Sequence, residues 1–168
     1  FPCRPVPSGK YKAKSPFTEH GFKEASRDPD QIRVWYHEFP GCLWGVPTGK
    51  TTRLVVLDYD PDKATQDTQE WIEGHTELLM LARAHTTGRN GRHYLYRASN
   101  GAIYSCGSNI TLDKKKRPGL DIRGEGGYII WWPLEGLASQ GEAPELPGLG
   151  LSTDLAEAVA RYSFKLMA

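Results

Sequence analysis

The sequence predicts an α+β fold, because helical and extended segments are mixed along 168 residues, which suffice for one domain with a buried core. Three observations support this prediction. A capped helical segment spans residues 28–39, an apolar run rich in β-branched residues spans 53–57, and an Asn-Gly pair at 90–91 joins two strand-like segments. Because Asn-Gly is the strongest short signal for a hairpin, the sheet is expected to contain antiparallel strands.

The first helix is predicted over residues 28–39, where the leading residues have the chemistry of a helix start. Asp28 suits the N-cap, Pro29 suits the first helical position, and Asp30 places an acid in the first turn. Residues 40–49, which contain Gly, Pro and Thr, predict a connection to the next element.

A buried strand is predicted at 53–57, and it ends at the acids Asp58 and Asp60. Residues 63–81 then place polar positions first and apolar positions later. This pattern predicts one helix, or a helix that is interrupted near Gly74.

Extended segments dominate the second half of the chain. The expected strands are 83–87, 93–96, 102–106, 109–112, 120–123 and 127–132. The first two flank the Asn-Gly pair and predict a hairpin, and the next two predict a second hairpin-like pair. Residues 1–133 are therefore interpreted as one folded domain, 134–150 as a linker rich in Pro, Gly and Glu, and 151–168 as a C-terminal helix.

The net charge of +1 indicates no partner by itself, but the charges are unevenly distributed. Residues 58–77 contain seven acids and one lysine, a local sum of −6. Residues 83–123 contain nine bases and two acids, a local sum of +7, and include the run 113–118, which is expected to be a loop. Adjacent acidic and basic blocks suit a cation site beside an anion site, but charge counts alone favour two solvated faces.

Composition excludes several classes of protein. No run approaches the roughly 20 apolar residues of a membrane-spanning helix, and the first residues lack the apolar stretch of a signal peptide, so no membrane partner is expected. Cys3, Cys42 and Cys106 are too far apart for a CxxC zinc motif. We therefore expect no zinc and a reducing, cytoplasmic location.

Asp58 and Asp60 are predicted to form a pair of carboxylates at the end of the strand. Side chains two residues apart project to the same face of a strand, and two close carboxylates repel each other unless a cation lies between them. Mg²⁺ and Mn²⁺ prefer such oxygen ligands together with substrate phosphate oxygens. The same residues also suit a strand-end turn, so both interpretations stay open.

Asp121 lies in another expected strand, where a carboxylate is costly unless it is paired or bound to a metal. If this strand neighbours the first one, three carboxylates converge. Arg123 lies two residues further along the same face and offers a simpler account, which is a structural ion pair with Asp121.

Basic side chains gather at two places. Arg89, Arg92 and His93 suit a triphosphate, since arginine binds phosphate oxygens in a bidentate manner and histidine can add a hydrogen bond. The second group, which suits the phosphate backbone of a nucleic acid, is Lys114, Lys115, Lys116 and Arg117. Both groups are also compatible with ordinary solvated surface.

Four motifs follow one another along the chain. They are GVPTG at 45–49, LVVLDYD at 54–60, TGRNGRHYLY at 87–96 and GLDIRGEGGY at 119–128. In this order and spacing they resemble the bifunctional DNA primase/polymerase (prim-pol) domain at the start of plasmid and phage replication proteins, within the archaeo-eukaryotic primase superfamily. The resemblance covers about residues 5–133. Gly91 departs from it, because some superfamily members have serine two residues before the histidine.

The resemblance implies a catalytic core made of an RRM-like antiparallel sheet, with flanking helices and a small N-terminal α/β unit. It also implies that Asp58 and Asp60 form the first catalytic motif, His93 belongs to the second and Asp121 to the third. These three acids would hold two Mg²⁺ or Mn²⁺ ions about 3.5–4 Å apart. The arginines that would bind the triphosphate beside the histidine are Arg89, Arg92 and Arg123.

The activity implied by the resemblance is template-directed nucleotidyl transfer, by a DNA primase, a DNA polymerase or both, in a phage or plasmid replication protein of a bacterial or archaeal host cell. The substrates would be a single-stranded DNA template and NTPs or dNTPs, and a helicase or accessory helical domain is expected in the full-length protein. Two alternatives stay open, a non-catalytic RRM-like module that binds single-stranded nucleic acid and a metal-dependent nuclease. Nucleotide incorporation distinguishes the enzyme from the binding module, and degradation without nucleotides identifies the nuclease.

Overall fold

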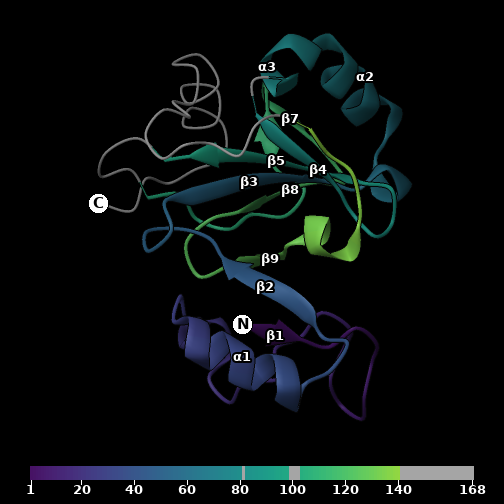
Figure 1. Ribbon diagram of the computed structural model, residues 1–168. Coiled ribbons are helices and arrows are strands. Elements are labelled where there is room, and N and C mark those ends of the chain that lie inside the picture. Colours follow the sequence, from purple (N-terminus) through teal and green to yellow (C-terminus); the bar gives the residue numbers. More distant parts are fainter. Residues whose placement is uncertain (81, 99–102, 141–168) are drawn as a thin grey trace.

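The computed structural model describes residues 1–80, 82–98 and 103–140. The helices are α1 (Pro29–Glu38), α2 (Gln66–Gly74) and α3 (Thr76–Met80), with 3₁₀ turns at Gly21–Glu24, Pro61–Lys63 and Trp132–Glu135. The strands are β1 (Pro2–Cys3), β2 (Leu43–Pro47), β3 (Leu54–Tyr59), β4 (Arg83–Thr86), β5 (Arg92–Arg97), β6 (Thr111–Leu112), β7 (Lys115–Lys116), β8 (Leu120–Arg123), β9 (Tyr128–Ile130) and β10 (Ser139–Gln140). The two larger sheets face each other, and helices cover their outer faces (Figure 1). No helix in the described residues is long and apolar enough to cross a membrane.

The larger sheet has the strand order β10-β4-β5-β3-β8, and all neighbouring strands in it are antiparallel. After β3 the chain passes through α2 and α3 to the β4–β5 hairpin, and it later returns as β8 on the other side of β3. Without β10 this is the order of an RRM-like sheet, in which the β6–β7 hairpin takes the place of the second helix. The predicted α+β fold with an RRM-like antiparallel sheet is therefore confirmed.

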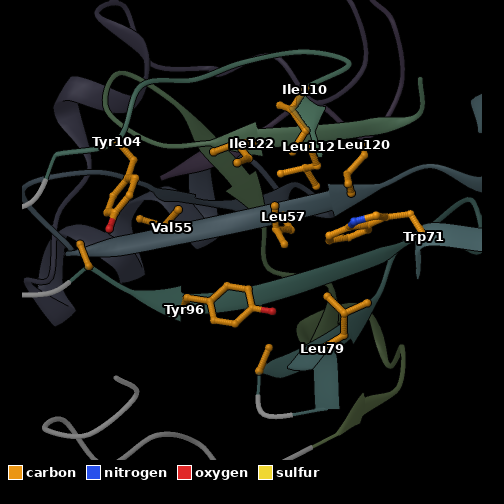
Figure 2. Close-up of a cluster of buried hydrophobic side chains, with 12 residues drawn as sticks. Val55, Leu57, Trp71, Leu79, Tyr96, Tyr104, Ile110, Leu112, Leu120 and Ile122 are labelled. Carbon is orange, nitrogen blue, oxygen red and sulfur yellow. The ribbon is translucent and has the colours of Figure 1, made fainter. Parts of the chain in front are cut away.

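Alternation along β3 divides its side chains between the two faces of this sheet. Val55 and Leu57 belong to a buried apolar cluster, where Trp71 of α2 and Leu79 of α3 pack over the sheet and Tyr96 of β5 lies beside them (Figure 2). This face is filled by apolar side chains. Its role is to hold β3 and β5 rigidly in place.

The opposite face of the sheet changes from apolar to polar along β3. Val56, which is 0% exposed, packs with Leu95 of β5 and Ile129 of β9 and joins the two sheets. Two residues later on the same face the chain has Asp58 in place of an apolar residue. The two sheets are thus packed together at one end of this face, whereas polar side chains occupy the other end.

The smaller sheet has the order β1-β2-β9 and is covered by α1. Its core contains Phe1, Trp35 of α1 and Ile130 of β9. Helix α1 starts as predicted, because the carboxylate of Asp28 accepts a 3.0 Å hydrogen bond from the backbone N–H of Asp30. This unit matches the expected N-terminal α/β unit, although its third strand comes from a distant part of the sequence.

Two local predictions in the larger sheet are also confirmed. Of the two alternatives for the segment after β3, the structure shows the helix interrupted near Gly74, where α2 ends before α3 begins. The Asn-Gly pair lies in the β4–β5 hairpin, where Asn90 has a positive φ of 59° and its N–H donates to the carbonyl of Thr87 at 3.1 Å. Asparagine tolerates this left-handed conformation better than most residues.

Gly91 is required for the close approach between this turn and β3. A Cβ at Gly91 would lie 2.4 Å from the carbonyl oxygen of Tyr59, which is backbone and therefore cannot move aside cheaply. We expect Gly91→Ala to lower the free energy of unfolding by about 1–3 kcal/mol, measured by urea denaturation. Gly74→Ala is the control, since a Cβ there meets no atom within 4 Å. Equal stability of both variants would contradict this prediction.

Several expectations for the loops are wrong. The segment 40–49 was expected to be a connection but contains β2, which pairs with β1 and β9. Within the described residues, 103–106 do not pair with 109–112, and β6 pairs instead with β7 inside the basic run. β2 is thus extended through its pairing with distant strands, whereas β6 and β7 form a short local hairpin within a polar segment that was expected to be a loop.

The folded part of the chain continues beyond Pro133. Residues Trp132–Glu135 form a 3₁₀ turn, and β10 joins the edge of the larger sheet by pairing with β4. The expected linker 134–150 thus contributes a strand up to Gln140. Its remainder and the expected C-terminal helix at 151–168 lie outside the described residues.

Candidate active site

A cleft of about 480 Å³ opens where the two sheets separate. Asp58, His93 and Asp121 line one wall on the larger sheet, and residues Tyr128 to Ile130 of β9 line the other. Lys14 reaches the cleft from the N-terminal segment. The cleft therefore brings together charged residues from distant parts of the sequence.

A histidine and two carboxylates form one row across the larger sheet. Asp58 on β3 lies directly opposite His93 on β5 and directly opposite Asp121 on β8. Residues that are opposite each other in antiparallel strands point to the same face, so all three side chains face the cleft. The condition set in the sequence analysis is therefore met, because the strands that carry Asp58 and Asp121 are neighbours.

Asp58 is held in its ionised form. Burial alone would raise the pKa of this carboxyl, but the hydrogen bond and charge of His93 and the guanidinium of Arg123 outweigh it and lower the pKa to about 2. Nε2 of His93 lies 3.5 Å from one carboxylate oxygen, and Nη2 of Arg123 lies 3.0 Å from the other. Asp58 is thus a fixed negative charge at neutral pH.

Asp121 is fixed by a loop and by the same arginine. Its Oδ1 accepts a 2.9 Å hydrogen bond from the backbone N–H of Asn109, and its Oδ2 accepts one of 3.0 Å from Nη2 of Arg123. The hydroxyl of Ser108 approaches the same Oδ2 at 3.4 Å. The ion pair with Arg123 that the sequence left open is therefore present, and Arg123 connects Asp58 with Asp121.

Asp60 follows the end of β3 and lies among bases. Its Oδ2 is 2.8 Å from the ammonium of Lys63 and 3.1 Å from Nη2 of Arg89. Its Oδ1 is buried and has no hydrogen-bond partner in the part of the chain that the structure describes. Asp60 lines the cleft and therefore brings one carboxylate oxygen to this region that no described residue binds.

The basic residues predicted to bind a triphosphate are only partly brought together. Arg89 and Arg123 line the cleft beside His93. Arg92 does not, because it precedes His93 on the strand and so projects from the other face, where its guanidinium donates to the hydroxyl of Thr86. Because side chains alternate between the two faces along β5, Arg92 and His93 point to opposite sides of the sheet.

The basic run lies outside the cleft lining. Lys114, Lys115 and Lys116 are exposed, and the ammonium of Lys115 pairs with Asp67 of α2 at 3.0 Å. Arg117 is buried and donates a 2.8 Å hydrogen bond to the backbone carbonyl of Asp67. Arg117 is therefore not exposed with the three lysines but connects the hairpin to α2, and nucleic-acid binding by this run stays a prediction.

Lys14 and Cys106 are among the cleft residues that sequence patterns did not single out. Lys14 is half-buried, and its ammonium lies 5.1 Å from the ring centre of Trp132. Cys106 is exposed, and its Sγ accepts a 3.3 Å hydrogen bond from the N–H of Gly124. The only sequence signal for Lys14 was its place near the start of residues 5–133, which the prim-pol resemblance covers.

The carboxylates fit a divalent cation in part. Among residues 1–80, 82–98 and 103–140, no three His, Cys, Asp or Glu side chains are grouped closely enough to hold a metal ion. Asp58 is nevertheless ionised, and Asp60 offers an unpartnered oxygen, which is the chemistry that Mg²⁺ and Mn²⁺ prefer. The metal-binding role of Asp58, Asp60 and Asp121 stays a prediction.

An RRM-like sheet with a His-Asp-Asp row beside arginines and a lysine is an arrangement whose charges suit a phosphate-type ligand. A family model described as bifunctional DNA primase/polymerase, N-terminal, matches residues 1–144, which is most of the chain. The chain therefore belongs to this family, and the resemblance seen in its sequence is confirmed. DNA and nucleotides are the substrates that the family description implies. A comparison with curated proteins gave no match.

Proposed function

We propose that this chain is a template-directed nucleotidyltransferase, acting as a DNA primase, a DNA polymerase or both, and that its reaction takes place in the cleft. The observation that supports this most strongly is the row of His93, Asp58 and Asp121 across three adjacent strands, in a chain of the primase/polymerase family. Ionised carboxylates beside arginines suit a reaction between a hydroxyl and a phosphate, where charge stabilisation is the main source of catalysis.

Asp58, Asp60 and Asp121 would hold the divalent ions, two Mg²⁺ or Mn²⁺ in our proposal. When bound, such ions activate the attacking 3′-hydroxyl and neutralise the triphosphate. Asp58 contributes a carboxylate that stays charged throughout the neutral range, because its pKa is about 2. The unpartnered oxygen of Asp60 contributes a second anionic ligand from the same strand end.

The basic residues bind and orient the nucleotide. Arg123 lies between Asp58 and Asp121, so a phosphate oxygen close to either acid is also close to its guanidinium. Arg89 reaches Asp60 from the turn between β4 and β5. Both arginines would therefore neutralise charge that develops on the leaving pyrophosphate. His93 would fix the position of the Asp58 carboxylate through its contact with the other carboxylate oxygen.

The DNA template would pass over the exposed part of the basic run. Lys114, Lys115 and Lys116 remain exposed on the β6–β7 hairpin and suit a phosphate backbone, whereas Arg117 does not take part in this proposal because it is buried. We further propose that the chain works in the cytoplasm of a bacterial or archaeal cell, in a phage or plasmid replication protein that also has a helicase or accessory helical domain.

The test is incorporation of labelled dNTPs and NTPs on a single-stranded DNA template, with and without an annealed primer, in Mg²⁺, in Mn²⁺ and in EDTA. We expect metal-dependent products. Primer-free products would identify a primase, and extension of a primer alone would identify a polymerase. Template degradation without nucleotides would instead indicate a nuclease, and DNA binding without any product would indicate a binding module, so either result would overturn the proposal.

A further inference from the structure

Lys14 is aimed into the cleft by a fixed segment of backbone. It has a positive φ of 68°, which is uncommon for a residue with a side chain. Its N–H donates a 2.7 Å hydrogen bond to the carbonyl of Arg4, and its carbonyl accepts one of 3.0 Å from the hydroxyl of Tyr128. Conformations of this kind persist only where the surroundings enforce them, and they are common at ligand sites.

The ammonium of Lys14 is half-buried on the wall opposite the carboxylates. It faces the ring of Trp132 at 5.1 Å, and within the described residues it makes no hydrogen bond or ion pair. Burial lowers the pKa of Lys14, and the charge of Arg89 lowers it further, while Asp58 and Asp60 act in the opposite direction. The charge of Lys14 is therefore influenced by both bases and acids of the cleft, but no carboxylate in the described residues pairs with it.

Other bases of the cleft are already paired with its carboxylates. Lys63 and Arg89 pair with Asp60, and Arg123 pairs with Asp58. Lys14 differs from them because it approaches from the N-terminal segment and has no such partner in the described part of the chain. An anion placed between Lys14 and Arg89 would relieve their mutual repulsion and bridge the two walls.

We propose that Lys14 binds the terminal phosphate of the incoming nucleoside triphosphate, so that the phosphate tail is held between the N-terminal segment and the larger sheet. This inference rests on the proposed function and adds a residue that the sequence motifs did not assign. A compact ammonium suits a terminal phosphate, which presents several oxygens around one centre. Lys14 would thus favour triphosphates over diphosphates and monophosphates.

The test is binding, measured without turnover by isothermal titration calorimetry of the 168-residue chain. The probes are inorganic tripolyphosphate, a dNTP, the matching dNDP and a single-stranded oligonucleotide. We expect Lys14→Met to weaken tripolyphosphate and dNTP binding by about ten- to a hundredfold, the scale of one charge-assisted hydrogen bond. Affinity for dNDP should change far less, and Lys14→Arg should restore part of the loss.

Lys12→Met is the matched control, because Lys12 is an exposed lysine of the same segment that does not line the cleft. It should leave tripolyphosphate and dNTP affinity unchanged. Unchanged tripolyphosphate affinity in a folded Lys14→Met variant would overturn the inference and leave Lys14 as a packing partner of Trp132. A loss confined to the oligonucleotide would also overturn it and assign Lys14 to the DNA path.

The two proposals fail in different ways. If the unsubstituted chain incorporates no nucleotide but shows triphosphate binding that depends on Lys14, the proposed function is wrong and the phosphate site stands. If incorporation occurs, and if the KM for dNTP and the kcat of Lys14→Met equal those of the unsubstituted chain, the proposed function stands and this inference is wrong.

Discussion

Asp58→Asn is expected to reduce nucleotide incorporation by about a thousandfold or more, which is the scale of losing a pre-organised charge in an active site. The substitution removes the negative charge while keeping the shape of the side chain. His93 and Arg123 then lose the carboxylate that they share. In the unsubstituted chain, that carboxylate lies 3.5 Å from Nε2 of His93 and 3.0 Å from Nη2 of Arg123. The measurement is initial-rate incorporation of labelled dNTP on a primed template.

Asp58→Asn is also expected to remain folded, with a free energy of unfolding lowered by about 1–3 kcal/mol, because Arg123 keeps its bond to Asp121. Circular dichroism and urea denaturation check this. Asp62→Asn is the matched control, since Asp62 is an exposed acid just beyond the end of β3. Incorporation at the unsubstituted rate by folded Asp58→Asn would rule out the catalytic assignment of this row.

The part of the site that could be predicted from the sequence depends on local periodicity. Asp58 lies near the end of the apolar strand β3, and the alternation of a strand places it on the face opposite Leu57. Asp121 and His93 lie on strands recognisable from their own residues. In the RRM-like order these two strands lie on either side of β3. Local patterns do not predict this long-range pairing, so it came from the family resemblance.

Arg92 and Arg117 were misplaced for a physical reason. Sequence proximity to His93 suggested that Arg92 shares its site, but adjacent residues of a strand point to opposite faces. Arg117 belongs to a run of bases, yet its guanidinium is buried against the start of α2. The number of charges along a segment does not show which of its side chains become buried when the segment folds as a hairpin.

Lys14 and β2 could not be placed because their partners are far away in the sequence. β2 contains glycine and proline and is extended because it pairs with β9 and β1. Lys14 reaches the cleft because its segment is fixed to Arg4 and to Tyr128 of β9. Tertiary contacts of this kind leave no periodic signal in a single sequence.

Acidification from pH 6.5 to pH 4 is expected to destabilise the protein through His85, by about 3 kcal/mol. His85 lies on β4 directly opposite His93, is 0% exposed and packs edge-on against Trp131 at 4.6 Å between ring centres. Its Nε2 accepts a 2.9 Å hydrogen bond from Nε of Arg83. Burial above all, with the nearby charges of Arg83 and His93, lowers its pKa from 6.5 to about 4.

The direction follows from proton linkage. Between pH 6.5 and pH 4 the unfolded chain binds a proton at His85 and the folded chain does not, so the free energy of unfolding falls as the pH falls. His85→Gln keeps a hydrogen-bond acceptor for Arg83 but cannot titrate. Urea denaturation of both proteins at intervals across this range should show a steeper pH dependence for the unsubstituted chain. Parallel curves would mean that His85 is protonated as readily in the folded state as in the unfolded state, contrary to its burial.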